Sequence, residues 1–185
     1  MKPLAERDGY RRFKLAVFAL LVVNTIVYTV QGTPGEALDS IAWYTLLLLF
    51  ELETAHAQRL STRRAVTAVH AVRLAAAAAI LVAAAGYLYE RAWLDAMNAW
   101  LWIVLVVLLE IEVRYVQPVT RHRVRFVAAT TVVYSGLAMV ALAWAWRGEW
   151  FDAYDALLWL AAFATIEMNL LRARAPSARA TSGGT

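Results

Sequence analysis

The sequence predicts an all-α integral membrane protein, a six-transmembrane-helix bundle built from three two-helix hairpins. The chain of 185 residues is 62% hydrophobic and has a mean hydropathy of +0.54, and a soluble domain of this size does not hide that much apolar surface. Its apolar runs also approach the roughly 20 residues that cross a bilayer core. The six runs span 13–30, 38–53, 65–89, 96–115, 126–146 and 154–171.

Taken in order, the first run predicts a retained helix, because no small-residue cleavage site of a signal peptide follows it. The second and sixth runs are among the shortest, and both carry carboxylates within the apolar sequence, as the fourth run also does. The third run is rich in alanine and contains Gly86. Small residues let helix backbones approach closely, so we expect this helix to be packed against neighbours. The fourth and fifth runs are long, apolar and bounded by charged connections.

Charged residues divide between the two ends of the predicted helices. All but two of the 18 basic residues lie in the termini and the second and fourth connections or in the parts of the runs next to them; the exceptions are Arg91 and Arg147. The odd-numbered connections are acidic instead. This is the positive-inside pattern of membrane proteins, and it places both termini in the cytoplasm. We expect the inner membrane of a bacterium or archaeon, with the lipid bilayer as partner. A nucleic-acid partner is not supported, because the positive charge follows membrane topology.

The even-numbered runs repeat one another. Adding 59 to the residue numbers of the second run reaches the fourth, and adding 57 more reaches the sixth, without a gap. Self-similarity at a fixed period predicts a repeated supersecondary unit, here a two-helix hairpin. The matched positions are Asp39, Asn98 and Asp155; Trp43, Trp102 and Trp159; Glu51, Glu110 and Glu167; and Glu53, Glu112 and Asn169.

Three such units predict a pseudo-threefold bundle. The repeats cover about 10–58, 65–117 and 123–173 of a single domain, 1–173. The segment 174–185 is rich in alanine, serine and glycine and is expected to be a disordered cytoplasmic tail. The alternative is chance similarity within the narrow alphabet of membrane helices. Tryptophan and glutamate are the residues least expected to match by composition alone, and both recur in all three copies.

The matched residues form a stripe along each even helix. At 100° per residue, Trp43 lies about 40° and Glu53 about −40° from Asp39, whereas Glu51 lies about 120° away. We expect Asp39, Asn98 and Asp155 to form an outer vestibule and Trp43, Trp102 and Trp159 a constriction. The expected ion-binding or path-lining residues lie deeper: Glu51, Glu110, Glu167, Glu53, Glu112 and Asn169.

An ionisable side chain inside a membrane is costly, so it has a charged partner or a functional role. Rings of carboxylates are a common device for selecting cations. The first hypothesis is therefore a channel or transporter for an inorganic cation or proton, with an acid-lined pseudo-threefold path. The alternative is a non-catalytic scaffold or assembly subunit of a membrane complex, in which the glutamates pair with basic residues of the odd helices. Association with further copies of the chain fits either hypothesis.

Several other classes of function are not supported by the sequence. Because cysteine is absent, disulfides, thiol catalysis and thiolate metal sites are excluded. No Ser/His/Asp cluster, glycine-rich phosphate loop or HExxH motif indicates an enzyme. Glu53 and His56 share a helix face, but the repeat does not keep the histidine, which argues against a metal site. We expect no cofactor.

Overall fold

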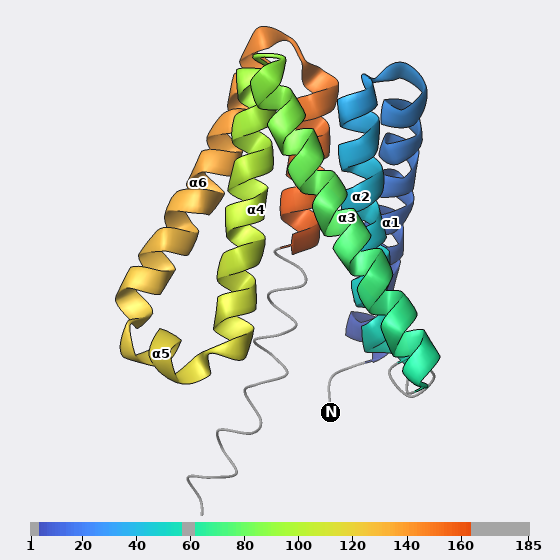
Figure 1. Cartoon of the computed structure of the whole chain (residues 1–185), viewed down its shortest axis with the longest axis vertical. Coiled ribbons are helices and arrows are strands. Elements are labelled where there is room, and N and C mark those ends of the chain that lie inside the picture. The colour runs from blue at the N-terminus through green and yellow to red at the C-terminus, as the bar shows by residue number, and fades with distance from the viewer. Residues whose placement is uncertain (1–3, 57–61, 164–185) are drawn as a thin grey trace, which may run out of the picture.

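The computed structural model describes residues 4–56 and 62–163, and every regular element in these two ranges is a helix (Figure 1). The prediction of an all-α protein is confirmed for this part of the chain. A last described helix covers 150–163, where the description ends. The named helices are α1 (Leu4–Gln31), α2 (Pro34–His56), α3 (Arg63–Tyr89), α4 (Trp93–Arg114), α5 (Val116–Arg121) and α6 (Arg123–Arg147).

Three short turns join α1 to α2, α3 to α4, and α6 to the last described helix. All three lie at one end of the bundle, the upper end in Figure 1, which we call the turn end. The short helix α5 lies at the opposite end, between α4 and α6, and we call this the α5 end. The three helical hairpins therefore have their turns at the same end of the bundle.

The described helices close into a ring. Neighbours pack in the order α1, α2, α3, α4 and α6. The last described helix packs on α6 through Ala153 and Ala156, which share a buried cluster with Trp144. It also returns to α1, where Leu21 shares a buried cluster with Ala162.

The turns use different local devices to end one helix and begin the next. The first is a capping box: the Thr33 backbone N–H donates to Glu36, and the Glu36 backbone N–H donates to the Thr33 hydroxyl. The other two turns contain residues with left-handed backbone conformations, Arg91 at φ 61° and Gly148 at φ 82°. Each reverses the chain within a few residues, so that the paired helices run side by side.

Apolar packing along the ring leaves much of the outer surface apolar. Leu105 is fully buried at the centre, together with Ile80 and Leu137. By contrast, Val30 and Leu74 are about three-quarters exposed. Large apolar side chains facing outward in this number are typical of helices surrounded by lipid.

Four of the described helices are long and apolar enough to cross a membrane, which indicates a membrane protein: Arg11–Gln31, Arg63–Tyr89, Trp93–Glu112 and Arg123–Arg147. The second predicted span is not among them, because Asp39, Glu51 and Glu53 lower the hydropathy of α2. The sixth predicted span lies only partly within the described residues. Glu167, Asn169 and the predicted tail 174–185 lie outside them.

The turn at Gly148 gives a test of the fold. An alanine there must adopt the left-handed conformation, which costs roughly 1–2 kcal/mol, so Gly148→Ala should lower the thermal unfolding temperature in detergent. Gly86→Ala is the matched control. Gly86 lies inside α3 with open space around the position of an added Cβ, and alanine there should stabilise the helix by roughly 0.5–1 kcal/mol. Equal effects of the two substitutions would contradict the turn geometry.

Candidate functional site

Three indole rings meet where α2, α4 and the last described helix come together. Trp43 of α2, Trp102 of α4 and Trp159 of the last described helix have ring centroids 6.2, 6.4 and 6.5 Å apart. The planes of each pair are inclined by 59–64°, which is close to the favourable edge-to-face arrangement of aromatic rings. We call these residues the tryptophan triad. The structure thus brings together the three residues that the sequence predicts as a constriction.

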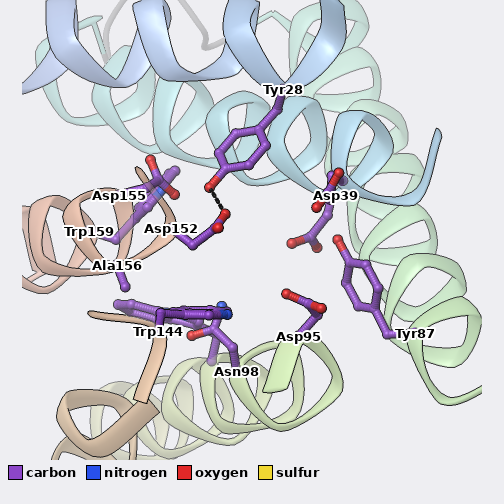
Figure 2. Close-up of a pocket in the computed structure, with 12 residues that line it drawn as sticks. Tyr28, Asp39, Tyr87, Asp95, Asn98, Trp144, Asp152, Asp155, Ala156 and Trp159 are labelled. Atoms are coloured by element: carbon purple, nitrogen blue, oxygen red, sulfur yellow. Dashed lines mark hydrogen bonds between the residues drawn. The ribbon is translucent and has the colours of Figure 1, made fainter. Parts of the chain in front are cut away.

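The triad forms the floor of a small cavity at the turn end. Two adjacent spaces of about 60 and 40 Å³ share the side chains of Asp39, Asn98, Trp102, Asp155 and Trp159. We call them together the acidic cavity. Figure 2 shows side chains from α1, α2, α3, α4, α6 and the last described helix directed toward this space. The further lining residues are Tyr28, Glu36, Ser40, Trp43, Tyr87, Asp95, Trp144, Asp152 and Ala156.

The expected vestibule residues Asp39, Asn98 and Asp155 therefore lie around one cavity. Sequence reasoning missed a second set of acids around it, which occupy equivalent positions of the repeat.

 The three residues, Glu36, Asp95 and Asp152, line the larger space. The signal was present, because they are related by the same offsets of 59 and 57 that relate the tryptophans.

Hydrogen bonds from α1 hold one side of the cavity in place. Asn24, which is only 3% exposed, donates from Nδ2 to Asp155 Oδ1 at 2.6 Å. The Tyr28 hydroxyl donates to Asp152 Oδ1 at 2.8 Å, as the dashed line in Figure 2 shows. Partial burial raises the pKa of Asp152, and the Tyr28 hydrogen bond opposes that shift by favouring the carboxylate. These bonds tie α1 to the last described helix.

On the other side, Trp43 donates a hydrogen bond to the Asp39 carboxylate, but two oxygen acceptors have no donor. Asp39 Oδ1 and Asn98 Oδ1 are buried and accept no hydrogen bond within the described part of the chain. The lining includes five carboxylates, those of Glu36, Asp39, Asp95, Asp152 and Asp155, and no lysine, arginine or histidine. A buried acceptor without a partner costs roughly 1–3 kcal/mol. The cavity is therefore suited to a cation or to a ligand that donates hydrogen bonds.

The expected path-lining glutamates lie elsewhere, toward the α5 end, and the structure does not bring them together with the triad. Glu51 of α2 forms an ion pair with Lys14 of α1 at 2.5 Å. Glu53 of α2 pairs with Arg73 of α3, so these two carboxylates link neighbouring helices. Glu167 and Asn169 lie outside the described residues.

In α4, Glu110 pairs with Arg114 one turn along the same helix. Glu112 lines a separate cavity of about 510 Å³ between α4, α5 and α6, together with Arg123, Thr130 and Tyr134. Among the residues that the structure describes, no three histidine, aspartate or glutamate side chains are placed to hold a metal ion.

Comparisons with protein-family models, with curated proteins and with solved structures give no significant match to this chain. The candidate site therefore rests on its own geometry.

The triad should be important for stability. Trp102 is 5% exposed and contacts Trp43, Trp159 and Phe163. Truncating a buried aromatic residue costs about 3–5 kcal/mol, so Trp102→Ala should lower the free energy of unfolding by this amount. Trp146→Ala is the control, because Trp146 is 93% exposed and its removal should change stability by about 0.5 kcal/mol or less. Denaturant titration in detergent measures both; equal losses would contradict the central packing.

Proposed function

We propose that the chain is a small integral membrane transporter or channel for a cation or proton, with the acidic cavity as its binding site. The observation that supports this most strongly is the convergence of five carboxylates and one amide on a central space without a basic side chain. Rings of acidic groups attract cations and exclude anions. Such a cluster is costly in a membrane protein, which favours a role in binding.

The proposal includes three hairpin repeats around a pseudo-threefold axis. The nearly equal separations within the tryptophan triad support it. The backbone carbonyls of Tyr87 and Trp144, which are repeat equivalents, accept hydrogen bonds from Ala92 and Glu149, which are also equivalents, at 3.0 and 2.9 Å. The second and third turns thus share one hydrogen-bonding pattern.

Contacts between successive hairpins add to this support. The ring of Tyr28 in α1 packs against the ring of Phe151, with centroids 5.1 Å apart and planes inclined by 56°. The ring of Tyr87 in α3 lies beside Gly35, at 3.4 Å from the position of an added Cβ. Leu94 packs against the cluster that contains Trp144. Gly35, Leu94 and Phe151 are related by the offsets of the repeat, so each outer aromatic side chain meets the same position of the preceding hairpin.

We also propose that α2 and the last described helix cross the membrane, which completes six spans with both termini in the cytoplasm. Mean hydropathy underestimates the tendency of α2 to cross the membrane, because its carboxylates do not face lipid. Asp39 lines the acidic cavity, while Glu51 and Glu53 form ion pairs with α1 and α3. Intramembrane charges that are paired or directed inward are compatible with a spanning helix. The turn end then faces away from the cytoplasm.

In this proposal the acidic cavity receives the cation and the triad blocks further movement. Beyond the triad lie fully or largely buried apolar side chains, including Leu105 and Leu137. A cation has no favourable site among them, so passage toward the α5 end requires the indole rings to separate.

The second candidate function is a scaffold or assembly subunit in a larger membrane complex. The ion pairs favour it, because Lys14–Glu51 joins α1 to α2 and Arg73–Glu53 joins α2 to α3. Removing one partner of such a pair leaves an unpaired charge in the membrane, which destabilises the bundle whether or not the protein transports anything. On this reading the glutamates that the sequence singles out fix the arrangement of the hairpins.

Flux in liposomes tests the transport proposal. Wild-type protein should conduct potassium or protons, and the double variant Asp39→Asn/Asp155→Asn should lose about tenfold or more of that flux, because two central carboxylates become neutral. Glu90→Gln is the control. It removes one carboxylate at an exposed position near the turn end, outside the lining, and should leave flux unchanged.

The Glu51→Gln variant separates a path through the acidic cavity from a path along the deeper glutamates. Transport through the acidic cavity predicts reduced stability with flux per folded molecule largely retained, whereas a path along the deeper glutamates predicts lost flux at unchanged stability. Wild-type liposomes without cation or proton flux would contradict the transport proposal.

A further inference from the structure

We infer that the acidic cavity binds a compact alkylammonium ion, of about the size of methylammonium, in preference to an inorganic metal ion. This inference rests on the proposed cation-handling function and names its substrate class. The observation behind it is the combination of carboxylates and aromatic rings around one small space. Five aromatic side chains line the larger part of the cavity: Tyr28, Tyr87, Trp102, Trp144 and Trp159.

Aromatic rings distinguish among cations. The negative face of an indole or phenol ring attracts a cation by about 0.5–2 kcal/mol, and proteins use such rings to recognise ammonium groups. A metal ion instead requires several oxygen ligands at about 2.0–2.6 Å. In the described residues no three acidic or histidine side chains come together in that way. The lining is therefore closer in chemistry to an ammonium site than to a metal site.

The available acceptors suit N–H donors. Asp39 Oδ1 and Asn98 Oδ1 are buried, lie on different helices and have no hydrogen-bond partner in the described chain. A primary ammonium carries three N–H groups, which are enough donors for both oxygens. The Oδ1 atoms of Asp152 and Asp155 already accept from Tyr28 and Asn24. Their charge still favours a cation, while Asp39 and Asn98 determine where its hydrogen bonds are made.

The size of the cavity limits the ligand. Ligand pockets for drug-sized molecules occupy about 300–1,000 Å³, whereas the two adjacent spaces here measure about 60 and 40 Å³. The larger one holds at least about two water-sized groups. Methylammonium has two non-hydrogen atoms, and its methyl group would lie among the aromatic side chains while its ammonium group meets the carboxylates.

Isothermal titration of the purified full-length chain in detergent tests this inference. We expect methylammonium chloride to bind about tenfold or more tightly than potassium chloride or magnesium chloride, a difference of about 1.4 kcal/mol or more. Methanol, which is similar in size but neutral, should not bind measurably. Equal or tighter binding of potassium or magnesium would overturn the inference.

Two sets of variants locate the site. Asp39→Asn should weaken methylammonium binding about tenfold or more, while Glu90→Gln should not change it. Trp144→Leu should weaken binding, while Trp144→Phe should retain most of it because the aromatic face remains. Intrinsic fluorescence and size-exclusion profiles show whether each variant is folded. Unchanged binding in folded Asp39→Asn protein would overturn the assignment, even if the tryptophan variants do not fold.

Liposome measurements keep this inference distinct from the proposed function. Methylammonium binding by a protein that shows no cation flux would support the assigned ligand and contradict transport. Potassium or proton flux by a protein that does not bind methylammonium would support transport and contradict the assigned ligand.

Discussion

The mutual packing of three tryptophans fixes the relative depth of the helices on which the rest of the structure depends. Each ring of the triad comes from a different helix, and each lies 6.2–6.5 Å from the other two. Sliding one helix by a single turn moves its ring by about 5.4 Å and breaks two contacts at once. Apolar faces alone would not give this specificity, because lipid tails are as apolar as leucine side chains. The triad therefore sets both the register of the helices and the floor of the acidic cavity.

The hairpin topology explains why carboxylates have basic partners at the α5 end but not around the acidic cavity at the turn end. Because all three turns lie at one end, α2, α4 and the last described helix all begin there. Helix N-termini carry partial positive charge, which stabilises nearby carboxylates such as Asp95 and Asp152. At the other end of α2 and α4 the helix dipole is unfavourable to a carboxylate. There Glu51, Glu53 and Glu110 each have a basic partner.

The sequence predicted the all-α class, and hydrophobicity was enough for that, because long apolar runs have few other structures open to them. The repeat offsets placed Asp39, Asn98 and Asp155 in corresponding positions, which the structure brings around one cavity. The deeper glutamates could not be assigned in the same way. Helix periodicity gives the direction of Glu51 on its own helix, but the choice between a shared path and the ion pair with Lys14 depends on the rotation of α1. Tertiary packing sets that rotation, and one sequence does not reveal it.

Stability and transport would depend on the same contacts in the proposed function. The triad closes the cavity toward Leu105, which is fully buried, so a cation crosses only when at least one ring moves. Each aromatic pair contributes about 0.5–1.5 kcal/mol beyond the burial of its surface, a small part of the total stability of a folded domain. One hairpin can therefore withdraw its tryptophan while the other two rings remain in contact. At the α5 end, the ion pairs of Glu51 and Glu53 join α2 to α1 and to α3. In the proposed function the hydrogen bonds of Asn24 to Asp155 and of Tyr28 to Asp152 lie beside the cavity that receives the cation, so binding there acts directly on contacts between α1 and the last described helix.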